Sequence, residues 1–274
     1  MRIPSLRRRA VLVVVAVLSL ASSVVAHDLF LKLTTYFLPA DTPVRVLVLN
    51  GTFDKSESVV ARDRIAAIAL AGPAGITSLD TTALTFRNDT SFVNLRTGAA
   101  GTYVLGLSVR SRQVDYTAAQ FNEYLKADGY DDVLAERTRA GALEQAGKRR
   151  YATHVKAIFQ VGTARSDAYS AVLGHAAEIV PLDNPYGLAR GGTLRVRCLV
   201  DGKPMEGLMV HSGGLTADGA AFQGTAVHTG VDGMASVLLG HAGRWYVKFS
   251  KMRSSSITSV NYESERTSLT FEVR

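Results

Sequence analysis

The residue with the clearest potential for chemistry is His27, which stands between a short apolar run and an alternating, strand-like segment. A cut after Ala26 would make His27 the first residue of the mature chain. Its α-amine and imidazole could then hold one metal ion as a two-nitrogen chelate, and imidazole suits zinc, copper, iron and nickel. The alternative is a histidine left there by chance, because lone histidines are usually structural or solvated.

Residues 1–26 carry the marks of a secretory signal peptide. Arginines at positions 2 and 7–9 precede an apolar run over residues 10–20, and small residues lead to Ala26. The run is too short for a stable membrane span, and its flanks fit a signal that is removed after Ala26. We therefore expect a periplasmic or secreted protein with no transmembrane span in the mature chain.

The charge of the protein argues against nucleic acid as a partner. Loss of residues 1–26 removes four arginines and no acidic residue, which lowers the formal net charge from +7 to +3. So small a charge gives little support for binding to a phosphate backbone. The single cysteine, Cys198, allows no internal disulfide, so the hydrophobic core must suffice for stability.

Three further histidines, His211, His228 and His241, are the candidates to complete a metal site with His27. The chain has no H-x-x-x-H or H-E-x-x-H motif, so spacing alone does not assemble a site. His211 is expected to point outward from its strand. His228 and His241 flank a hairpin predicted at residues 231–233 and are expected at neighbouring strand ends. For each of the three, a solvated surface histidine is the alternative.

Signatures of enzymes are missing from the sequence, and we expect a protein that is not an enzyme. There is no G-x-S-x-G elbow, no phosphate-binding loop and no C-x-x-C pair. One catalytic alternative is a copper oxidase of polysaccharides, in which His27 and a second histidine would brace the metal. Tyr186, Trp245 and Tyr246 could line a carbohydrate groove, but Trp245 shares a strand face with Val247 and is expected in the core.

Alternating apolar residues predict β-strands on both sides of a helical segment. Many short strands separated by turn signals favour an all-β protein of two antiparallel sandwiches. We expect one domain over residues 27–177 and a second over residues 178–274, because residues 178–187 hold two prolines and resemble a joint. Asp201-Gly202 predicts a hairpin. The clearest alternating runs are residues 29–33, 44–49, 64–70, 103–109, 151–161, 194–200, 208–211, 225–229, 235–239, 245–249 and 269–273.

Residues 116–147 differ in composition and predict a helical hairpin inserted into the first sandwich. They are rich in Ala, Glu, Leu, Lys and Arg. Thr117 can cap a helix that buries Phe121 and Leu125, and Gly129 fits the end of that helix.

The second helix of the hairpin is expected to begin at Asp131 or Asp132 and to end near Gly147, before a solvated turn at residues 148–150. We expect the hairpin to cover a sheet edge, with a direct functional role as the alternative.

A resemblance to a known family rests on stretches spread over nearly the whole mature chain. They are residues 26–32, 101–104, 178–187 with 201–204, and 262–264 with 269–273. These stretches resemble the DUF4198 family, and residues 178–187 are the most specific. The resemblance implies immunoglobulin-like sandwiches, the second similar to transthyretin-like or carboxypeptidase-regulatory modules. It also implies a periplasmic component of a nickel or cobalt uptake system. Because the sequence has no permease segment, a transport role would require a separate membrane partner, a membrane transporter or a TonB-type receptor.

One position departs from the family pattern. A histidine often precedes the methionine of segment 245–252 in the family, and Lys251 stands there in this chain. A protonated lysine is a poor metal ligand, so this departure counts against a metal site. By alternation Lys251 shares a face with Trp245, and its charge must reach a sheet end or a partner.

The function we expect is that of an exported binding protein that handles nickel or cobalt through His27, with copper as the alternative favoured by chelate chemistry. The competing expectation is a non-enzymatic structural module, or an adhesion-type module that binds carbohydrate, without metal.

Overall fold

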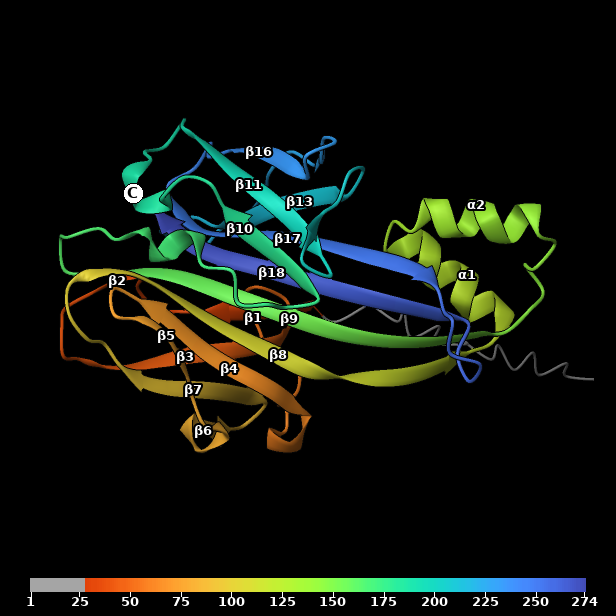
Figure 1. Ribbon diagram of the computed structural model, residues 1–274, viewed down its shortest axis with the longest axis horizontal. Helices are drawn as coiled ribbons and strands as arrows, with labels where there is room; N and C mark the ends of the chain where they lie inside the picture. Colours follow the sequence, from red (N-terminus) through yellow and green to blue (C-terminus); the bar gives the residue numbers. More distant parts are fainter. Residues whose placement is uncertain (1–27) are drawn as a thin grey trace, which may run out of the picture.

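The computed structural model describes residues 28–274, so the predicted signal peptide and His27 lie outside the described part of the chain. Strands make up 51% of the structure and helices 13%, which confirms the predicted all-β class with a small helical part. The strands form sandwich-like sheets in three layers, and the two α-helices lie together at one end of the molecule (Figure 1).

The largest sheet has ten strands and forms the middle layer (Figure 1). Its order is β14-β13-β17-β18-β9-β8-β4-β5, with β15 beside β13 and β2 beside β9. Most neighbours are antiparallel, but β9 pairs in parallel with both β18 and β2. Its strands are β2 (Phe37–Leu38), β4 (Ile65–Gly72), β5 (Gly75–Ser78), β8 (Gly101–Tyr116), β9 (Gly147–Val161), β13 (Met209–Leu215), β14 (Ala221–Gln223), β15 (Val227–His228), β17 (Gly243–Ser254) and β18 (Tyr262–Val273).

Two four-stranded sheets cover opposite faces of the ten-stranded sheet. On one face, the Ser268 and Thr270 hydroxyls of β18 donate to the carbonyl oxygens of Leu29 and Leu31 in β1, at 2.7 and 2.6 Å. The other sheet has the order β10-β11-β12, with β16 also beside β11. The strands of the two small sheets are β1 (Asp28–Lys32), β3 (Pro43–Gly51), β6 (Leu84–Arg87) and β7 (Thr90–Arg96), and then β10 (Ala177–Pro181), β11 (Thr193–Val200), β12 (Lys203–Pro204) and β16 (Met234–Leu238).

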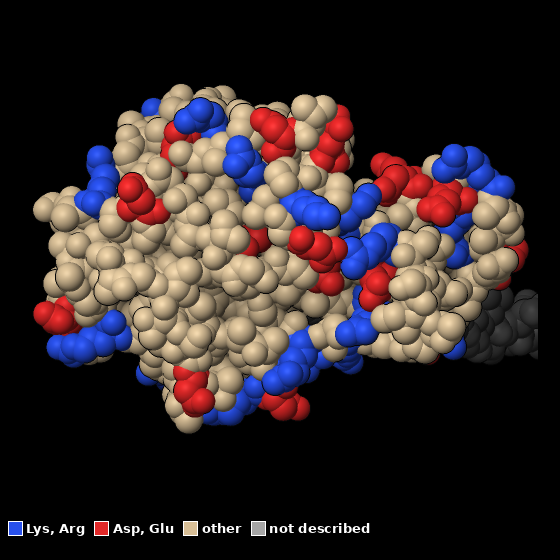
Figure 2. Space-filling model, in the orientation of Figure 1, with Lys and Arg blue, Asp and Glu red and all other residues tan. Residues whose placement is uncertain are grey.

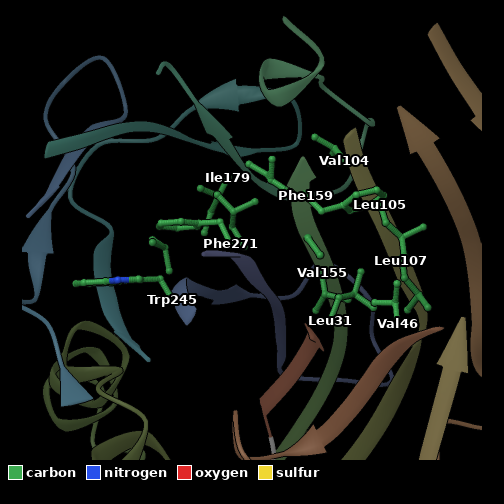
Figure 3. Packing of buried hydrophobic residues seen from close by; sticks show 14 of the residues in the cluster. Leu31, Val46, Val104, Leu105, Leu107, Val155, Phe159, Ile179, Trp245 and Phe271 are labelled. Atoms are coloured by element: carbon green, nitrogen blue, oxygen red, sulfur yellow. The ribbon is translucent and has the colours of Figure 1, made fainter. Parts of the chain in front are cut away.

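The hydrophobic core fills both gaps between the layers as one connected cluster. Leu31, Val46 and Val155 lie together between β1, β3 and β9, and Ile179 lies beside Phe271 on the other side (Figure 3). Alternation along each strand sends apolar side chains to these gaps, as the sequence predicts. Trp245 is 1% exposed, which confirms its predicted place in the core.

The two predicted sandwiches therefore share their central sheet. Strand β1 of one small sheet packs on β9 and β18, and strand β10 of the other packs on the same two central strands. The predicted boundary at residue 178 falls within β10. It stays a prediction, because one sheet and one core cluster pass across it.

The first helix of the predicted hairpin is confirmed as α1 (Ala118–Ala127). The Thr117 hydroxyl accepts from Gln120 N at 3.3 Å while the Gln120 side chain accepts from Thr117 N at 3.0 Å, a reciprocal cap that fixes where the helix starts. Phe121 and Leu125 are buried, as expected. Gly129 follows the helix with a positive φ of 73°, a conformation that favours glycine.

The predicted end of the second helix is wrong. Helix α2 (Asp131–Arg139) stops well before Gly147, and Gly141 follows it with a φ of 63°, which ends a helix readily. Gly147 instead begins β9, where a Cβ atom would lie 2.3 Å from Phe121 Cγ. The glycine thus lets α1 lie directly on the strand.

The predicted solvated turn at residues 148–150 is also wrong. These residues belong to β9, and Arg149 is only 3% exposed. The strand extends this far because β8 and β18 pair with it on either side. A run of three basic residues thus places its middle side chain in the interior and its outer two in solvent, as strand alternation requires.

Of the two predicted hairpins, one is confirmed. Asp201 and Gly202 both have positive φ, at 50° and 74°, and join β11 to β12. The hairpin predicted at residues 231–233 does not form, because β15 pairs with β13 while β16 pairs with β11 in another sheet.

A buried ion pair links β9 of the ten-stranded sheet to β10 of the small sheet packed against it. Lys156 Nζ lies 2.9 Å from Glu178 Oε1, and both side chains are at most 1% exposed. Lys156 also donates to the carbonyl oxygen of Ile179 at 3.1 Å. Burial opposes ionisation of Glu178, but Lys156 and backbone N–H donors outweigh it and lower the pKa of the carboxyl. Three of those donors come from residues 173–175, at 2.7, 3.1 and 3.3 Å.

We predict that Glu178→Ala destabilises the protein by about 3–5 kcal/mol, because it leaves the Lys156 ammonium buried without its counter-charge. Urea unfolding measures the loss. The matched control is Asp183→Ala, which removes a partner of the exposed Arg195 and should cost about 1 kcal/mol or less. Equal losses in the two variants would contradict a structural role for the buried pair.

Candidate functional site

The described chain begins at Asp28, which lies in a polar cluster on one face of the ten-stranded sheet. Its carboxylate pairs with Lys248 of β17 and with Arg266 of β18, the latter at 3.2 Å. Arg266 also pairs with Asp128 at the end of α1, at 3.2 Å. The start of β1 is therefore held by cations from two strands of the sheet, and one of them, Arg266, also binds the helical hairpin.

A cavity of about 600 Å³ opens beside this cluster, and we call it the N-terminal cavity. Strands β13, β17 and β18 form its floor, and the turn after α1 forms part of its wall. Polar side chains dominate its lining near the chain start, among them Asp28, Asp128, His211, Lys248 and Arg266.

His211 is the predicted ligand that the structure brings to this cavity. It lies in β13 with its side chain outward, as predicted, and its cross-strand partner is Lys248. Partial burial and the nearby Lys248 charge lower the pKa of His211, while Asp28 raises it. The imidazole is therefore neutral at neutral pH, which is the form that binds metal ions.

His228 and His241 lie elsewhere. His228 is exposed in β15, opposite Met209, and His241 precedes β17, where its ring stacks on Phe222 at 4.5 Å between ring centroids. Neither lines the N-terminal cavity. Within residues 28–274, no three His, Cys, Asp or Glu residues are placed to hold a metal ion together. His27, the fourth predicted ligand, lies outside the described residues.

The sequence profile of a family described as "Domain of unknown function (DUF4198)" matches residues 24–252. The chain belongs to the DUF4198 family. This DUF4198 chain has no significant match among curated proteins. Within residues 28–274, no helix combines the length and apolar character needed to cross a membrane.

Two solved structures are distantly similar to the DUF4198 chain. One is a tetra-tandem repeat in the extending region of a large adhesion protein, with 15% identity and a TM-score of 0.23, covering 90% of this chain and 49% of that one. The other is a DUF4785 family protein from Legionella pneumophila, with 10% identity and a TM-score of 0.24, covering 80% and 51%. The DUF4198 chain thus spans about half the length of each.

Lys251, the departure from the family pattern, finds a partner at the helical hairpin. Its ammonium lies 3.1 Å from Asp132 in α2, and the lysine side chain is 34% exposed. The expectation that this charge reaches a partner is confirmed. The pair helps to hold α2 against the end of β17.

Sequence reasoning missed a second cavity, of about 570 Å³, on the same face of the ten-stranded sheet. We call it the arginine cavity, because Arg64, Arg112 and Arg149 line it together with Arg266. It shares Leu29, Thr153 and Arg266 with the N-terminal cavity. A strand prediction for residues 148–150 would have been the signal, since it places Arg149 and Tyr151 on one face.

Sequence reasoning also missed a row of buried polar side chains on the opposite face of this sheet. The Ser108 hydroxyl lies 2.9 Å from His154 Nδ1, and His154 Nε2 lies 3.0 Å from Glu265. These are the residue types of a nucleophilic triad. However, Ser108 and His154 are each 7% exposed, so the hydroxyl faces the interior. We interpret the row as a structural network that satisfies polar groups between strands.

His175 stacks on His154 at 5.3 Å between ring centroids and adds a pH-sensitive group to this network. Its Nδ1 atom is buried without a hydrogen-bond partner among the described residues. Burial lowers the pKa of His175 to about 4, with His154 and Lys156 acting in the same direction and Glu178 opposing them. Protonation of this ring therefore disfavours the folded state.

We predict that the DUF4198 protein loses stability as pH falls from about 6.5 towards about 4, because unfolded His175 binds a proton that the folded ring resists. The contribution of this residue reaches about 3 kcal/mol below that window. Urea unfolding across pH should show a flatter profile for His175→Gln. The exposed His228→Gln variant should keep the wild-type slope, and an equal slope in His175→Gln would contradict the assignment.

Proposed function

We propose that this protein is an exported binding protein that holds a divalent transition metal ion at its mature N-terminus. Cleavage after Ala26 frees the amine of His27, and that amine and the His27 imidazole act as the first two ligands. Nickel or cobalt is the cargo suggested by the family resemblance, and copper is the alternative suggested by chelate chemistry. The protein carries out no reaction on the ion.

The observation that carries this proposal is the position of Asp28 at the N-terminal cavity, next to His211. Asp28 lines that cavity, and the two nitrogens of the preceding residue are the ligands that we propose to bind an ion there. His211 supplies a third nitrogen, and its lowered pKa keeps it unprotonated at neutral pH. An amine and two imidazoles form a nitrogen-rich ligand set, which suits nickel and copper.

The charges around Asp28 support nitrogen ligands over carboxylates. Asp28 is already paired with Lys248 and Arg266, and Asp128 is paired with Arg266. A metal ion that took either carboxylate would break an ion pair and meet a cation nearby. The amine and imidazoles offer neutral donors instead, so binding must release protons from them.

A transport role requires a membrane partner, because this chain would act as the exported component that delivers the ion. A membrane transporter or a TonB-type receptor is the class of partner we propose. The N-terminal cavity lies between the sandwich and the helical hairpin, so the hairpin offers such a partner a surface next to the bound ion.

We predict that protein beginning at His27 binds nickel and copper, whereas a form with one extra residue before His27 binds each at least about tenfold more weakly. The extension converts the chelating amine into an amide and leaves the imidazole in place. Affinity should fall as pH drops through about 8 to 6.5, because protons compete for amine and imidazole. Isothermal titration calorimetry of both forms measures this.

Within the same titration, His211→Gln should weaken binding about tenfold, and His228→Gln serves as the matched control. The expected preference is copper above nickel above cobalt, whatever the physiological cargo. Equal affinity of the native and extended forms, or no binding by either, would refute the N-terminal site and favour a structural or adhesion-type module.

A further inference from the structure

The lining of the arginine cavity has more basic than acidic residues. Arg64, Arg112, Arg149 and Arg266 line it, and Asp115 is the one acidic lining residue. Arg266 is engaged by Asp28 and Asp128. For the other three arginines, no carboxylate of residues 28–274 lies within ion-pair distance. Figure 2 shows basic side chains, with acidic side chains among them, where the helical hairpin meets the sandwich.

Arg149 lies deepest, at 3% exposed, in a cage of tyrosines. Its guanidinium lies over the rings of Tyr124, Tyr151 and Tyr116, at 4.2, 4.6 and 5.8 Å from their centroids. It donates to the Tyr124 hydroxyl, to the Tyr116 hydroxyl at 3.1 Å and to the Ser264 hydroxyl at 3.4 Å. The cage therefore fixes the guanidinium with neutral groups and leaves its charge uncompensated.

Two N–H bonds of Arg149 remain for another acceptor. A guanidinium has five, and the tyrosines and Ser264 accept three. Nε is among the atoms that are buried without a partner. A buried charged donor without an acceptor is costly, so native structures rarely retain one unless a ligand or water satisfies it.

The strand register explains why the cationic residues gather here. Arg112 faces Tyr151 and Val114 faces Arg149 across β8 and β9, which puts all four side chains on one face of the sheet. Arg64, the last residue of a short 3-10 helix before β4, also lines the cavity. The walls are mixed, since Asn50, Ser58 and Gln120 offer neutral polar groups beside Val59 and the tyrosine rings.

We propose that the arginine cavity is a binding site for a small organic polyanion, either a polycarboxylate or a phosphate ester. The planar guanidinium forks of Arg64, Arg112 and Arg149 match the geometry of carboxylate and phosphate oxygens. The tyrosine and valine side chains contact the carbon skeleton of the ligand. Arg149 acts as the fixed anchor. Arg64 and Arg112 are more exposed and contact the anion from the solvent side of the cavity, which we call its mouth.

This site does not depend on the metal site. The two cavities share lining residues, but none of Arg64, Arg112 or Arg149 lines the N-terminal cavity. An anion site and a metal site can therefore succeed or fail separately. Titration in metal-free buffer, with the mature chain and with its N-terminally extended form, keeps the two tests apart.

We predict that the mature protein binds tricarballylate or glycerol 3-phosphate in metal-free buffer at low salt, measured by isothermal titration calorimetry. Tricarballylate represents the polycarboxylates and glycerol 3-phosphate the phosphate esters. The double variant Arg64→Gln/Arg112→Gln should weaken binding at least about tenfold, because each charge-assisted hydrogen bond contributes strongly to affinity. Added salt should weaken binding as well.

The matched control is Arg150→Gln, which removes an exposed arginine from the opposite face of β9, next to Arg149. It should bind as the wild type does. Arg149→Lys keeps the charge but removes the fork, and it should also weaken binding about tenfold. The unfolding midpoint of each variant is measured in parallel, so that a loss of binding is read only from folded protein.

If Arg149→Lys unfolds, the double variant at the mouth decides the question, because its side chains are not buried. No binding of either anion, or equal binding by wild type and double variant, would overturn the proposal. Loss of metal binding in the extended form with anion binding retained would support both sites and show that they are separate.

Discussion

The parallel pairing of β9 with β18 is the constraint on which the rest of the molecule depends. It runs from Tyr262 opposite Arg149 to Thr270 opposite Ala157 and joins strands that are a hundred residues apart in the chain. Without it the two halves would be separate sandwiches, each with an open edge that invites mispairing. With it, both faces of the central strands are covered, so polar side chains there need internal partners.

Those internal partners divide between the two faces of the shared sheet. On one face, Lys156 pairs with Glu178, and His154 links Ser108 to Glu265. On the other face, the strands run past the cover of β1, and their polar side chains line the two cavities. The same alternation that buries a structural network on one face therefore presents a candidate site on the other.

Much of the fold could be predicted because its signals are local. Strand alternation, the cap formed by Thr117 and the Asp201-Gly202 turn each act within a few residues. The parallel join could not be predicted, since its partners are far apart in sequence and no turn marks their register. Pairing with β18 and β8 extends β9 back to Gly147, which is why a basic run typical of a solvated turn is a strand with one buried arginine.

The candidate site could be predicted from the sequence only where a single residue stands out by its type and position. His27 stands out by its place after a signal-like segment, and His211 by its outward phase, but their relation requires β1 and β13 to meet on one sheet face. No comparable sequence pattern indicates the arginine cavity. Three of its arginines come from β8, β9 and β18 and the fourth, Arg64, from the short 3-10 helix before β4, so only the cross-strand register brings them together.

The helical hairpin packs over the ends of the long central strands and also lines the two candidate sites. Phe121, Tyr124 and Tyr130 pack with Met252 and Tyr262 as a small second core, which covers the ends of the long strands. The same first helix lines both cavities, through Gln120 and Tyr124 on one side and Lys126 on the other. A helix fixed by its own core can hold polar groups rigidly at a cavity wall, which a flexible loop could not do. The packing that anchors the hairpin is thus what gives the candidate sites a fixed wall.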